Sequence, residues 1–409
     1  MLTDRGRAVL ALGGVVYLAA WAFGSVPLYP VALGLVFAVG AAAIWVRILD
    51  RPMFLRRSVG AGRHLDGDDV PVELELDVEG GVPLGSLGVH ESIARFGERE
   101  TTLVRRHGRL RGRYVLPRVP RGRYRIERAE IVLEDPFGLE RTTVPLGEQG
   151  SLLVYPRLVE LDRLFSEAGA RIPEGKRLLL RRPSGFDLHS VREYEPGESL
   201  RRVHWPTTAR RGRLMVKELE DAPRDEVAVV LDADRTIVVG EPPDSTFELQ
   251  VRAAGSILRT HASRGRRASL LVNGADRLYQ RVHSYDGEWS AALEILAAVE
   301  PDGTTPLATV LADEANAAMR ALELTVVTAV LSPRLVERLL QRMLLRQTGV
   351  VVYVDPASFG ARPAERTPTE IAAQLLRLER AGIPVVVLRR GDDLAERLGA
   401  SEAPEVALA

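Results

Sequence analysis

The feature that most limits how this chain can fold is a long stretch without charge near its start. No Asp, Glu, Lys or Arg occurs from Ala8 to Val46, although 27% of the 409 residues are charged. A helix crosses the hydrocarbon core of a bilayer in about 20 residues, so the stretch is too long for one span and suits two. Residues 24–27 read Gly-Ser-Val-Pro and supply a turn in its middle. We therefore predict two transmembrane helices, near residues 8–23 and 28–46.

The arginines around this stretch predict its orientation. Arg5 and Arg7 precede the first span, Arg47 and Arg51 follow the second, and the connecting turn carries no charge. Because basic residues flank membrane spans on the cytoplasmic side, both ends of the hairpin are expected there. We expect a cell-membrane protein with two spans, anchored by residues 1–57, whose soluble domains are cytoplasmic.

Two other interpretations of the stretch explain less. A cleaved signal peptide ending near residues 22–24 would leave the second apolar run without a role. A soluble helical hairpin is also disfavoured, because helices that are apolar on every face need a larger core than one hairpin supplies.

Short β-strands are the pattern that follows the anchor. In residues 70–78 apolar side chains alternate with Glu and Asp, as in a half-buried strand. Similar runs recur at roughly ten-residue spacing, at residues 112–116, 122–126, 129–133 and 152–155. This spacing predicts a small β-sandwich over residues 58–156.

A different pattern begins after a polar, Arg-rich connector over residues 157–226. Continuous apolar runs, typical of strands buried on both faces, occur at residues 227–231, 268–272, 324–331, 350–354 and 384–388. Helical patterns lie between them, and Ser332-Pro333 and Thr367-Pro368 are typical of helix starts. The alternation predicts a doubly wound α/β sheet over residues 227–409, so the fold class is α/β and β multidomain behind a two-helix hairpin.

Composition excludes several classes of protein. Lys and Arg number 55, and so do Asp and Glu, which excludes a disordered chain and a globally basic nucleic-acid binder. We therefore expect no nucleic-acid partner. The chain has no cysteine, which excludes disulfides, Cys-ligated zinc and thiol nucleophiles and agrees with a reducing compartment.

The first apolar run of the α/β part ends in carboxylates. Asp232 and Asp234 are spaced two apart, and Thr236 follows them. Magnesium prefers oxygen ligands, and ligands of such sheets bind at the carboxyl ends of the strands. A hydroxyl from Thr304 could reach the same edge, so these four residues form a candidate Mg site. The alternative is that Asp232 caps the next turn and Asp234 is solvated.

Residues 185–220 mix arginines and carboxylates with two aromatic side chains. The charges either pair with one another and pin the two domains together, or form a protein-docking surface, or bind phosphate or nucleic acid. The last reading is weak because the chain has 53 Arg and only two Lys, so Arg is its default cation. The candidate interaction residues are Arg192, Glu193, Tyr194, Arg201, His204, Trp205, Arg210 and Lys217.

Motifs of catalysis are not found around the histidines of this segment. Neither His189 nor His204 is accompanied by a G-x-S-x-G turn, an H-E-x-x-H helix or a closely spaced carboxylate pair. The chain also has no G-x-x-x-x-G-K-[ST] phosphate loop. We therefore expect a protein without enzymatic activity.

The segment that reads R-E-Y-x-P-G-E-x-x-R-x-V-H-W and then T-A-R-x-G-x-L-x-V-K-E resembles the signature of domain-of-unknown-function family 58. Arg121-Gly122-Arg123-Tyr124 and Asp135-Pro136-Phe137-Gly138-Leu139 resemble two further elements of that family, as does the N-terminal hairpin. The resemblance implies a sheet like the von Willebrand factor type A domain and an association with MoxR-type AAA+ ATPases. It implies no established enzymatic activity.

Type A domains often carry an adhesion site with D-x-S-x-S, a separate Thr and a later Asp. By the resemblance, Asp232 matches the first position, while Asp234 and Thr236 replace the two serines. Thr304 or Thr305 would be the separate Thr, and the later Asp is missing. The resemblance therefore implies a degenerate site at most.

These observations lead to one main hypothesis and two rivals. The main one is a membrane-anchored, non-enzymatic adaptor whose type A-like domain engages a MoxR-type AAA+ ATPase or its client protein. The first rival is a metal-dependent phosphate-handling or hydrolytic enzyme at the Asp232 strand end. The second is a structural organiser of envelope synthesis.

Overall fold

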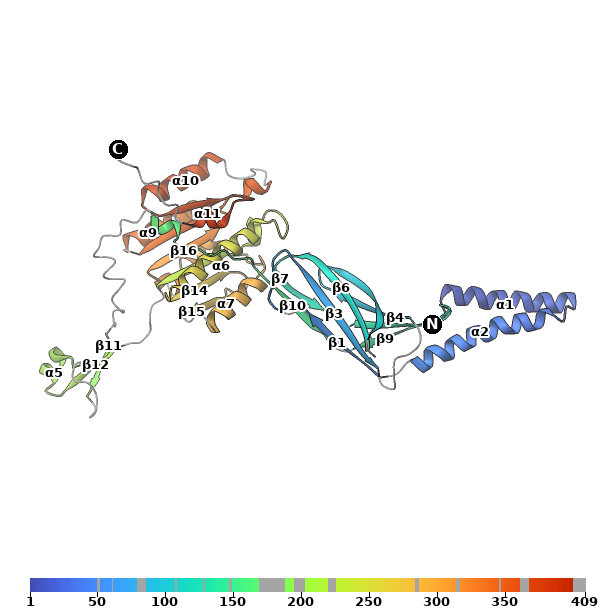
Figure 1. The fold of residues 1–409 in the computed structure, drawn as a ribbon. Coiled ribbons are helices and arrows are strands. Elements are labelled where there is room, and N and C mark those ends of the chain that lie inside the picture. The colour runs from blue at the N-terminus through green and yellow to red at the C-terminus, as the bar shows by residue number, and fades with distance from the viewer. Residues whose placement is uncertain are drawn as a thin grey trace, which may run out of the picture. The chain divides into compact units, whose positions relative to one another are not determined.

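A computed structural model of the protein describes residues 1–49, 52–60, 62–78, 86–106, 109–127, 129–146, 149–168, 188–194, 203–219, 226–283, 287–313, 317–345, 347–360 and 368–399. The chain divides into two compact units, which are described separately. The first comprises Met1–Arg157 with Glu294–Val299, and the second comprises Leu158–Leu293 with Glu300–Ala409. Figure 1 shows the elements of both.

Two long apolar helices, α1 (Asp4–Phe23) and α2 (Leu28–Leu49), open the first unit (Figure 1). The Thr3 side chain caps α1 by accepting a hydrogen bond from the Gly6 N–H, and Gly24 ends it in the left-handed conformation with φ 64°. The predicted turn therefore lies where the sequence placed it. By length and composition both helices could cross a membrane.

Small residues line one face of α1, and at Gly13 this face packs against α2. Gly6, Gly13 and Ala20 are buried on α1 at seven-residue spacing, which keeps them on one face of the helix. A side chain at Gly13 would lie 3.3 Å from Leu35 Cβ and 3.5 Å from the Ala32 carbonyl oxygen. Small residues allow helix backbones to approach closely, as in membrane helix pairs.

Large apolar side chains cover the outside of the hairpin. On α1, Trp21 and Phe23 are 74% and 84% exposed, and on α2, Phe37 is 77% exposed. The core helix of a soluble protein would bury such residues, so the pattern agrees with helices that face an apolar environment.

The rest of the first unit is a ten-stranded, mostly antiparallel sheet. Its strands are β1 (Met53–Val59), β2 (His64–Leu65), β3 (Asp68–Val78), β4 (Ser86–Ile93), β5 (Gly97–Arg106), β6 (Arg109–Val119), β7 (Gly122–Ile126), β8 (Ala129–Glu134), β9 (Arg141–Leu146) and β10 (Gly150–Tyr155). β5 pairs with both β6 and β4, so the strands form one curled sheet instead of two separate ones.

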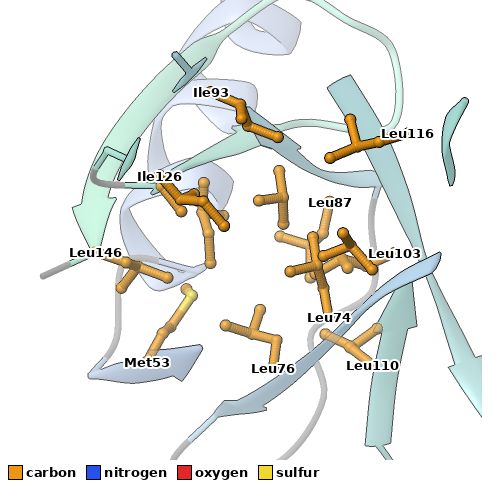
Figure 2. Packing of buried hydrophobic residues seen from close by; sticks show 14 of the residues in the cluster. Met53, Leu74, Leu76, Leu87, Ile93, Leu103, Leu110, Leu116, Ile126 and Leu146 are labelled. Atoms are coloured by element: carbon orange, nitrogen blue, oxygen red, sulfur yellow. The ribbon is translucent and has the colours of Figure 1, made fainter. Parts of the chain in front are cut away.

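A single apolar core fills the inside of this curl (Figure 2). On β3, Val70, Val72, Leu74 and Leu76 point inward, as their alternation with polar residues predicts. Side chains from strands on both sides of the curl, including Leu87, Ile126 and Leu146, meet them in Figure 2. The apolar face of the sheet is thereby removed from water.

The last turns of α2 belong to this core and not to a free span. Val46 and Leu49 are each 5% exposed and pack in the same cluster as Met53, and Trp45 packs against it. The sequence predicted a second span up to residue 46. An uncharged, apolar helix fits lipid and a protein interior equally well, so the sequence alone does not separate the two. The structure shows that the end of this run is buried by protein.

A buried polar cluster crosses the curl of the sheet. The Glu91 carboxylate on β4 is 2% exposed. It accepts hydrogen bonds from Arg57 Nε on β1 at 2.9 Å and from Tyr114 Oη on β6 at 2.5 Å. Burial and the hydrogen bond to Glu91 raise the pKa of the Tyr114 hydroxyl, so Tyr114 stays a neutral donor.

Replacing Glu91 with Ala should destabilise the first unit by about 3–5 kcal/mol, because Arg57 would keep a buried charge without its partner. Urea denaturation of the detergent-solubilised protein, followed by pulse proteolysis, measures the change. Glu75→Ala is the matched control, since Glu75 pairs with Arg109 on the solvent face of the same sheet. Equal effects of the two substitutions would show that the Glu91 cluster contributes no more than a surface pair.

The second unit contains a six-stranded sheet with the order β15-β14-β13-β16-β17-β18. All strands are parallel except the edge strand β15. The bounds are β13 (Val227–Asp232), β14 (Ala268–Asn273), β15 (Tyr279–Val282), β16 (Glu323–Thr328), β17 (Thr348–Val354) and β18 (Val385–Leu388). The order reverses beside β13, as in doubly wound sheets, and the continuous apolar runs are strands buried on both faces.

Helices follow most of these strands. They are α6 (Thr246–Ser263), α7 (Gly287–Ala298), α8 (Leu307–Val310), α9 (Pro333–Leu344), α10 (Pro368–Arg380) and α11 (Leu394–Leu398). The last turn of α7, from Glu294 on, belongs to the first unit. The predicted start of α9 is confirmed, because Ser332 Oγ accepts from the Leu335 N–H at 3.1 Å. Pro368 begins α10, and Thr367 lies outside the described residues.

A histidine is buried neutral on α6, which packs on β13, β14, β16 and β17. His261 is 0% exposed, and its Nδ1 lies 3.1 Å from Arg266 Nη1. Burial, with a smaller effect from Arg266 and Arg264, lowers its pKa to about 3.

This burial predicts a loss of stability in mild acid. In the unfolded chain His has a pKa of about 6.5 and binds a proton as the pH falls below that value, whereas the buried His261 imidazole of the folded protein does not. The stability that the neutral, buried His261 contributes is therefore fully present above about pH 6.5. It is lost as the pH falls toward the folded pKa, at up to about 1.4 kcal/mol per pH unit. Urea denaturation at two pH values in this window gives the change of the unfolding free energy with pH for the wild type and for His261→Gln, and the difference between the two changes measures the effect of His261. Equal changes in both proteins would contradict the burial of a neutral His261.

Candidate functional site

Three strand ends meet in a buried polar cluster at the carboxyl edge of the second unit's sheet. β13 ends at Asp232, β14 at Asn273 and β16 at Thr328, and all three side chains are at most 3% exposed. Asp232 Oδ2 accepts from Thr328 Oγ1 at 2.7 Å, and Oδ1 accepts from Asn273 Nδ2 at 3.0 Å. The Asp234 N–H lies 3.4 Å from Oδ1 as a weaker third donor.

The surroundings of Asp232 make it a structural acceptor. Burial raises the pKa of its carboxyl, while the hydrogen bonds from Thr328, Asn273 and the Asp234 backbone oppose that rise. Each oxygen of the Asp232 carboxylate accepts at least one of these hydrogen bonds. Asn273 Nδ2 also donates to the Thr305 carbonyl at 2.9 Å, so the cluster holds the neighbouring loop as well.

The other three predicted metal ligands lie at the same edge of the sheet. Asp234 Oδ1 accepts from both the N–H and the hydroxyl of Thr236, at 2.9 and 2.8 Å, and so caps a short 3-10 turn. A backbone bridge between Asp234 and Gly303 brings the exposed Thr304 to the same edge.

In the structure each oxygen of the Asp232 carboxylate accepts a side-chain hydrogen bond, Oδ1 from Asn273 and Oδ2 from Thr328. Among the described residues, no group of three or more His, Asp or Glu side chains could hold a metal ion. We assign the cluster to joining three strand ends.

Asp232→Ala should destabilise the second unit by roughly 2–4 kcal/mol, because it leaves several buried donors without an acceptor. Asp232→Asn keeps the shape and most of the hydrogen bonds and should cost less. Thermal unfolding of both variants and of the wild type, with and without Mg²⁺, measures this. A rise in the melting temperature with Mg²⁺ that disappears in Asp232→Asn would instead demonstrate a metal site.

The signature segment forms a small hairpin in the described residues. β11 (Leu188–Glu193) and β12 (Met215–Leu219) pair antiparallel, with Arg192 opposite Val216 and Val191 opposite Lys217. Between them lies the short helix α5 (Trp205–Arg211), which ends at Gly212 in the left-handed conformation with φ 65°.

Short polar contacts fix α5 on the hairpin. The His204 N–H donates to the Met215 carbonyl at 2.8 Å, and the Met215 N–H donates to Thr208 Oγ1 at 3.0 Å. His204 Nδ1 lies 2.7 Å from Thr207 Oγ1, so this imidazole orients the first turn of α5. Val203 and Val216 are buried beneath it.

Exposed aromatic and basic side chains lie at the two ends of α5. Trp205 at its start is 65% exposed, and Arg210 and Arg211 in its last turn are also exposed. Arg213 Nη1 lies 3.5 Å from Glu193 Oε1 in an exposed ion pair. Arg201 lies outside the described residues. We call Trp205, Arg210 and Arg211 the α5 face.

The two other elements of the resemblance are structural contacts within the first unit. Arg121 Nη1 donates to the carbonyls of Leu296, Ala297 and Val299, at 2.8, 3.1 and 2.7 Å. The Asp135 carboxylate accepts from three backbone N–H groups of its own loop.

Sequence reasoning missed the partners of Asp232. Asn273 and Thr328 end apolar runs far away in the chain, and nothing local marks them as neighbours. The signal that could have found them is the reversal of strand order beside β13, which places the second and fourth strands of the sheet on either side of the first.

The fold defines a mixed α/β protein with two N-terminal apolar helices and a curled β unit. Residues 190–359, which include most of the signature hairpin and strands β13 to β17, match the family described as "Protein of unknown function DUF58". The match covers less than half of the chain.

Individual proteins show weaker similarity. "Uncharacterized protein YeaD" of Bacillus subtilis (strain 168) is 25% identical over 194 residues, which are 47% of this chain and 47% of that protein. This chain thus matches about half the length of that relative. A structure of BhCBM56 (12% identity, 24% of this chain and 91% of that one) has a TM-score of 0.15. Cwp6 from Clostridium difficile (8% identity, 84% and 38%) has a TM-score of 0.16. Neither structural likeness bears on fold or function.

Proposed function

We propose that this protein is a membrane-anchored, non-enzymatic adaptor. Its hairpin would hold it in the cell membrane with both soluble parts in the cytoplasm, and its type A-like α/β domain would engage a MoxR-type AAA+ ATPase or that ATPase's client. The partner class comes from the resemblance to family 58 proteins.

The observation that carries the proposal is the α5 face. Trp and Arg dominate the binding energy of protein interfaces when partner groups desolvate them. Here the matched family segment presents Trp205 outward with Arg210 and Arg211, while the hairpin buries Val203, Met215 and Val216 beneath it. A segment that served only to pair its own charges would not need an exposed indole.

Two further features support the anchor and the domain. The outward apolar side chains of α1 and α2 suit lipid, and Arg5, Arg7 and Arg47 at one end favour the cytoplasmic side. The strand order and the polar residues at the carboxyl edge agree with a type A-like sheet. The metal-dependent rival would need further ligands beside Asp232, and the described residues supply no group of three or more His, Asp or Glu side chains that could hold a metal ion.

Trp205→Ala should weaken binding to the cognate MoxR-type ATPase about tenfold or more, since loss of a central aromatic anchor commonly costs at least 1.4 kcal/mol. Pull-down of the solubilised, tagged protein with that ATPase, with and without Mg-ATP, measures the loss. Phe54→Ala and Arg113→Ala are matched controls, because both residues are exposed and lie in the β unit, outside the domain proposed to bind.

Two results would contradict the proposal. One is the absence of ATPase enrichment under every nucleotide condition. The other is a reporter fused after Ala409 that is active only outside the cytoplasm, where the ATPase could not reach the protein. Binding that Trp205→Ala leaves unchanged would exclude the α5 face and remove the observation on which the proposal rests, even if the ATPase still binds elsewhere on the protein.

A further inference from the structure

The Asp135–Leu139 loop between β8 and β9 is held rigid from inside. Asp135 is 3% exposed, and its carboxylate accepts from the N–H groups of Phe137 at 2.9 Å and of Leu139 and Glu140 at 2.6 Å each. Gly138 adopts the left-handed conformation with φ 68°. The loop thus has a fixed shape, whatever its tip contacts.

This loop holds the start of the hairpin. The Thr3 N–H donates to the Leu139 carbonyl at 3.0 Å, and Thr3 Oγ1 donates to the Gly138 carbonyl at 2.6 Å. A side-chain carbon at Gly6 would lie 2.1 Å from the Leu139 oxygen, so only glycine permits this approach. The first turn of α1 and the loop therefore move as one body.

The contacts of Leu139 show which residues of the two helices lie beside the loop. It is 7% exposed and packs on Val39 and Ala42 of α2, with Val9 of α1 against the same cluster. Beyond this level α2 buries Val46 and Leu49 in the β core. Lipid can therefore surround the hairpin only between this level and the turn at Gly24.

The length of that part places the loop at the membrane surface. From Ala8 to Phe23, α1 rises about 24 Å at 1.5 Å per residue, whereas the hydrocarbon core is about 30 Å thick. A span this short leaves no room between the bilayer and the residues at its end. Leu139 and the Phe137 tip of its loop must then lie at the headgroup level.

An exposed aromatic ring and several arginines lie at this level, together with two acidic side chains. Phe137 is 77% exposed. Arg5 Nη1 and Glu134 Oε1 lie 3.8 and 2.9 Å from where a side-chain carbon at Gly138 would be. Arg7 Nη1 lies 3.6 Å from Oδ1 of the exposed Asp4, and Arg141 is also exposed. Aromatic rings settle in the headgroup layer, and arginines near the surface bind anionic lipids.

We propose that the Asp135–Leu139 loop is a membrane-contact element. Phe137 inserts into the headgroup layer of the leaflet at the open end of the hairpin, and the neighbouring arginines contact lipid phosphates. The loop thereby fixes the β unit directly against the bilayer. This inference rests on the proposed insertion of α1 and α2 in the membrane.

The absence of cysteine from the chain allows a direct test. Phe137→Cys, Val115→Cys and Leu18→Cys each provide one site for a nitroxide label in the full chain, reconstituted in vesicles of phosphatidylcholine and phosphatidylglycerol. Val115 on β6 is 47% exposed and serves as the aqueous control, while Leu18 on α1 is 63% exposed and reports the span. All three labels replace exposed side chains, and circular dichroism checks that the variants fold.

Electron paramagnetic resonance then compares collisions of each label with oxygen and with a water-soluble nickel chelate. We expect the label at residue 137 to lie about 5–10 Å into the boundary between headgroups and acyl chains, far more protected from nickel than the label at residue 115. If residue 18 is in hydrocarbon but residue 137 is as open to nickel as residue 115, the loop proposal is overturned and the anchor stands. If residue 18 is itself in water, both proposals fail.

Discussion

The rest of the first unit depends on helix α2, which is apolar throughout but has two different surroundings. Its first half exposes Phe37 and Leu33 beside α1, whereas its last turns bury Val46 and Leu49 in the core of the curled sheet. One continuous helix therefore joins the anchor to the β unit without a linker. Gly13 of α1 lets the two helices pack at close range, while Gly6 on the same face of α1 meets the Leu139 carbonyl.

In both units a buried carboxylate holds neighbouring strands together. Glu91 joins strands across the curl of the first sheet, and Asp232 joins three strand ends of the second. Each is a carboxylate held by donors from elements distant in sequence. Removing such a group leaves its donors buried and unpaired, so these positions specify which strands become neighbours. Carboxylates at a strand end are therefore ambiguous evidence for a metal site until their partners are known.

Much of the fold could be predicted from the sequence, because its signals are local. The turn at residues 24–27, the alternation on β3 and the cap at Ser332 each need only a few neighbouring residues. Contacts between distant residues could not be predicted this way. Asn273 and Thr328 become partners of Asp232 only through strand order, and the burial of Val46 depends on a core that no local pattern reveals. For the signature segment, the sequence left internal pairing and docking open; the structure shows Trp205 exposed.

The close contact between Gly6 and Leu139 has a mechanical consequence. If α1 and α2 span the bilayer as proposed, α1 enters it directly from a loop of the β unit and α2 leaves it directly into the β core, so the first unit has no hinge at the membrane. A helix pair shorter than the hydrocarbon core is accommodated by local thinning of the bilayer, whereas in a membrane thinner than the span the pair would tilt. Any tilt of this hairpin would turn the β unit by the same angle, so membrane thickness would set the direction in which that unit faces.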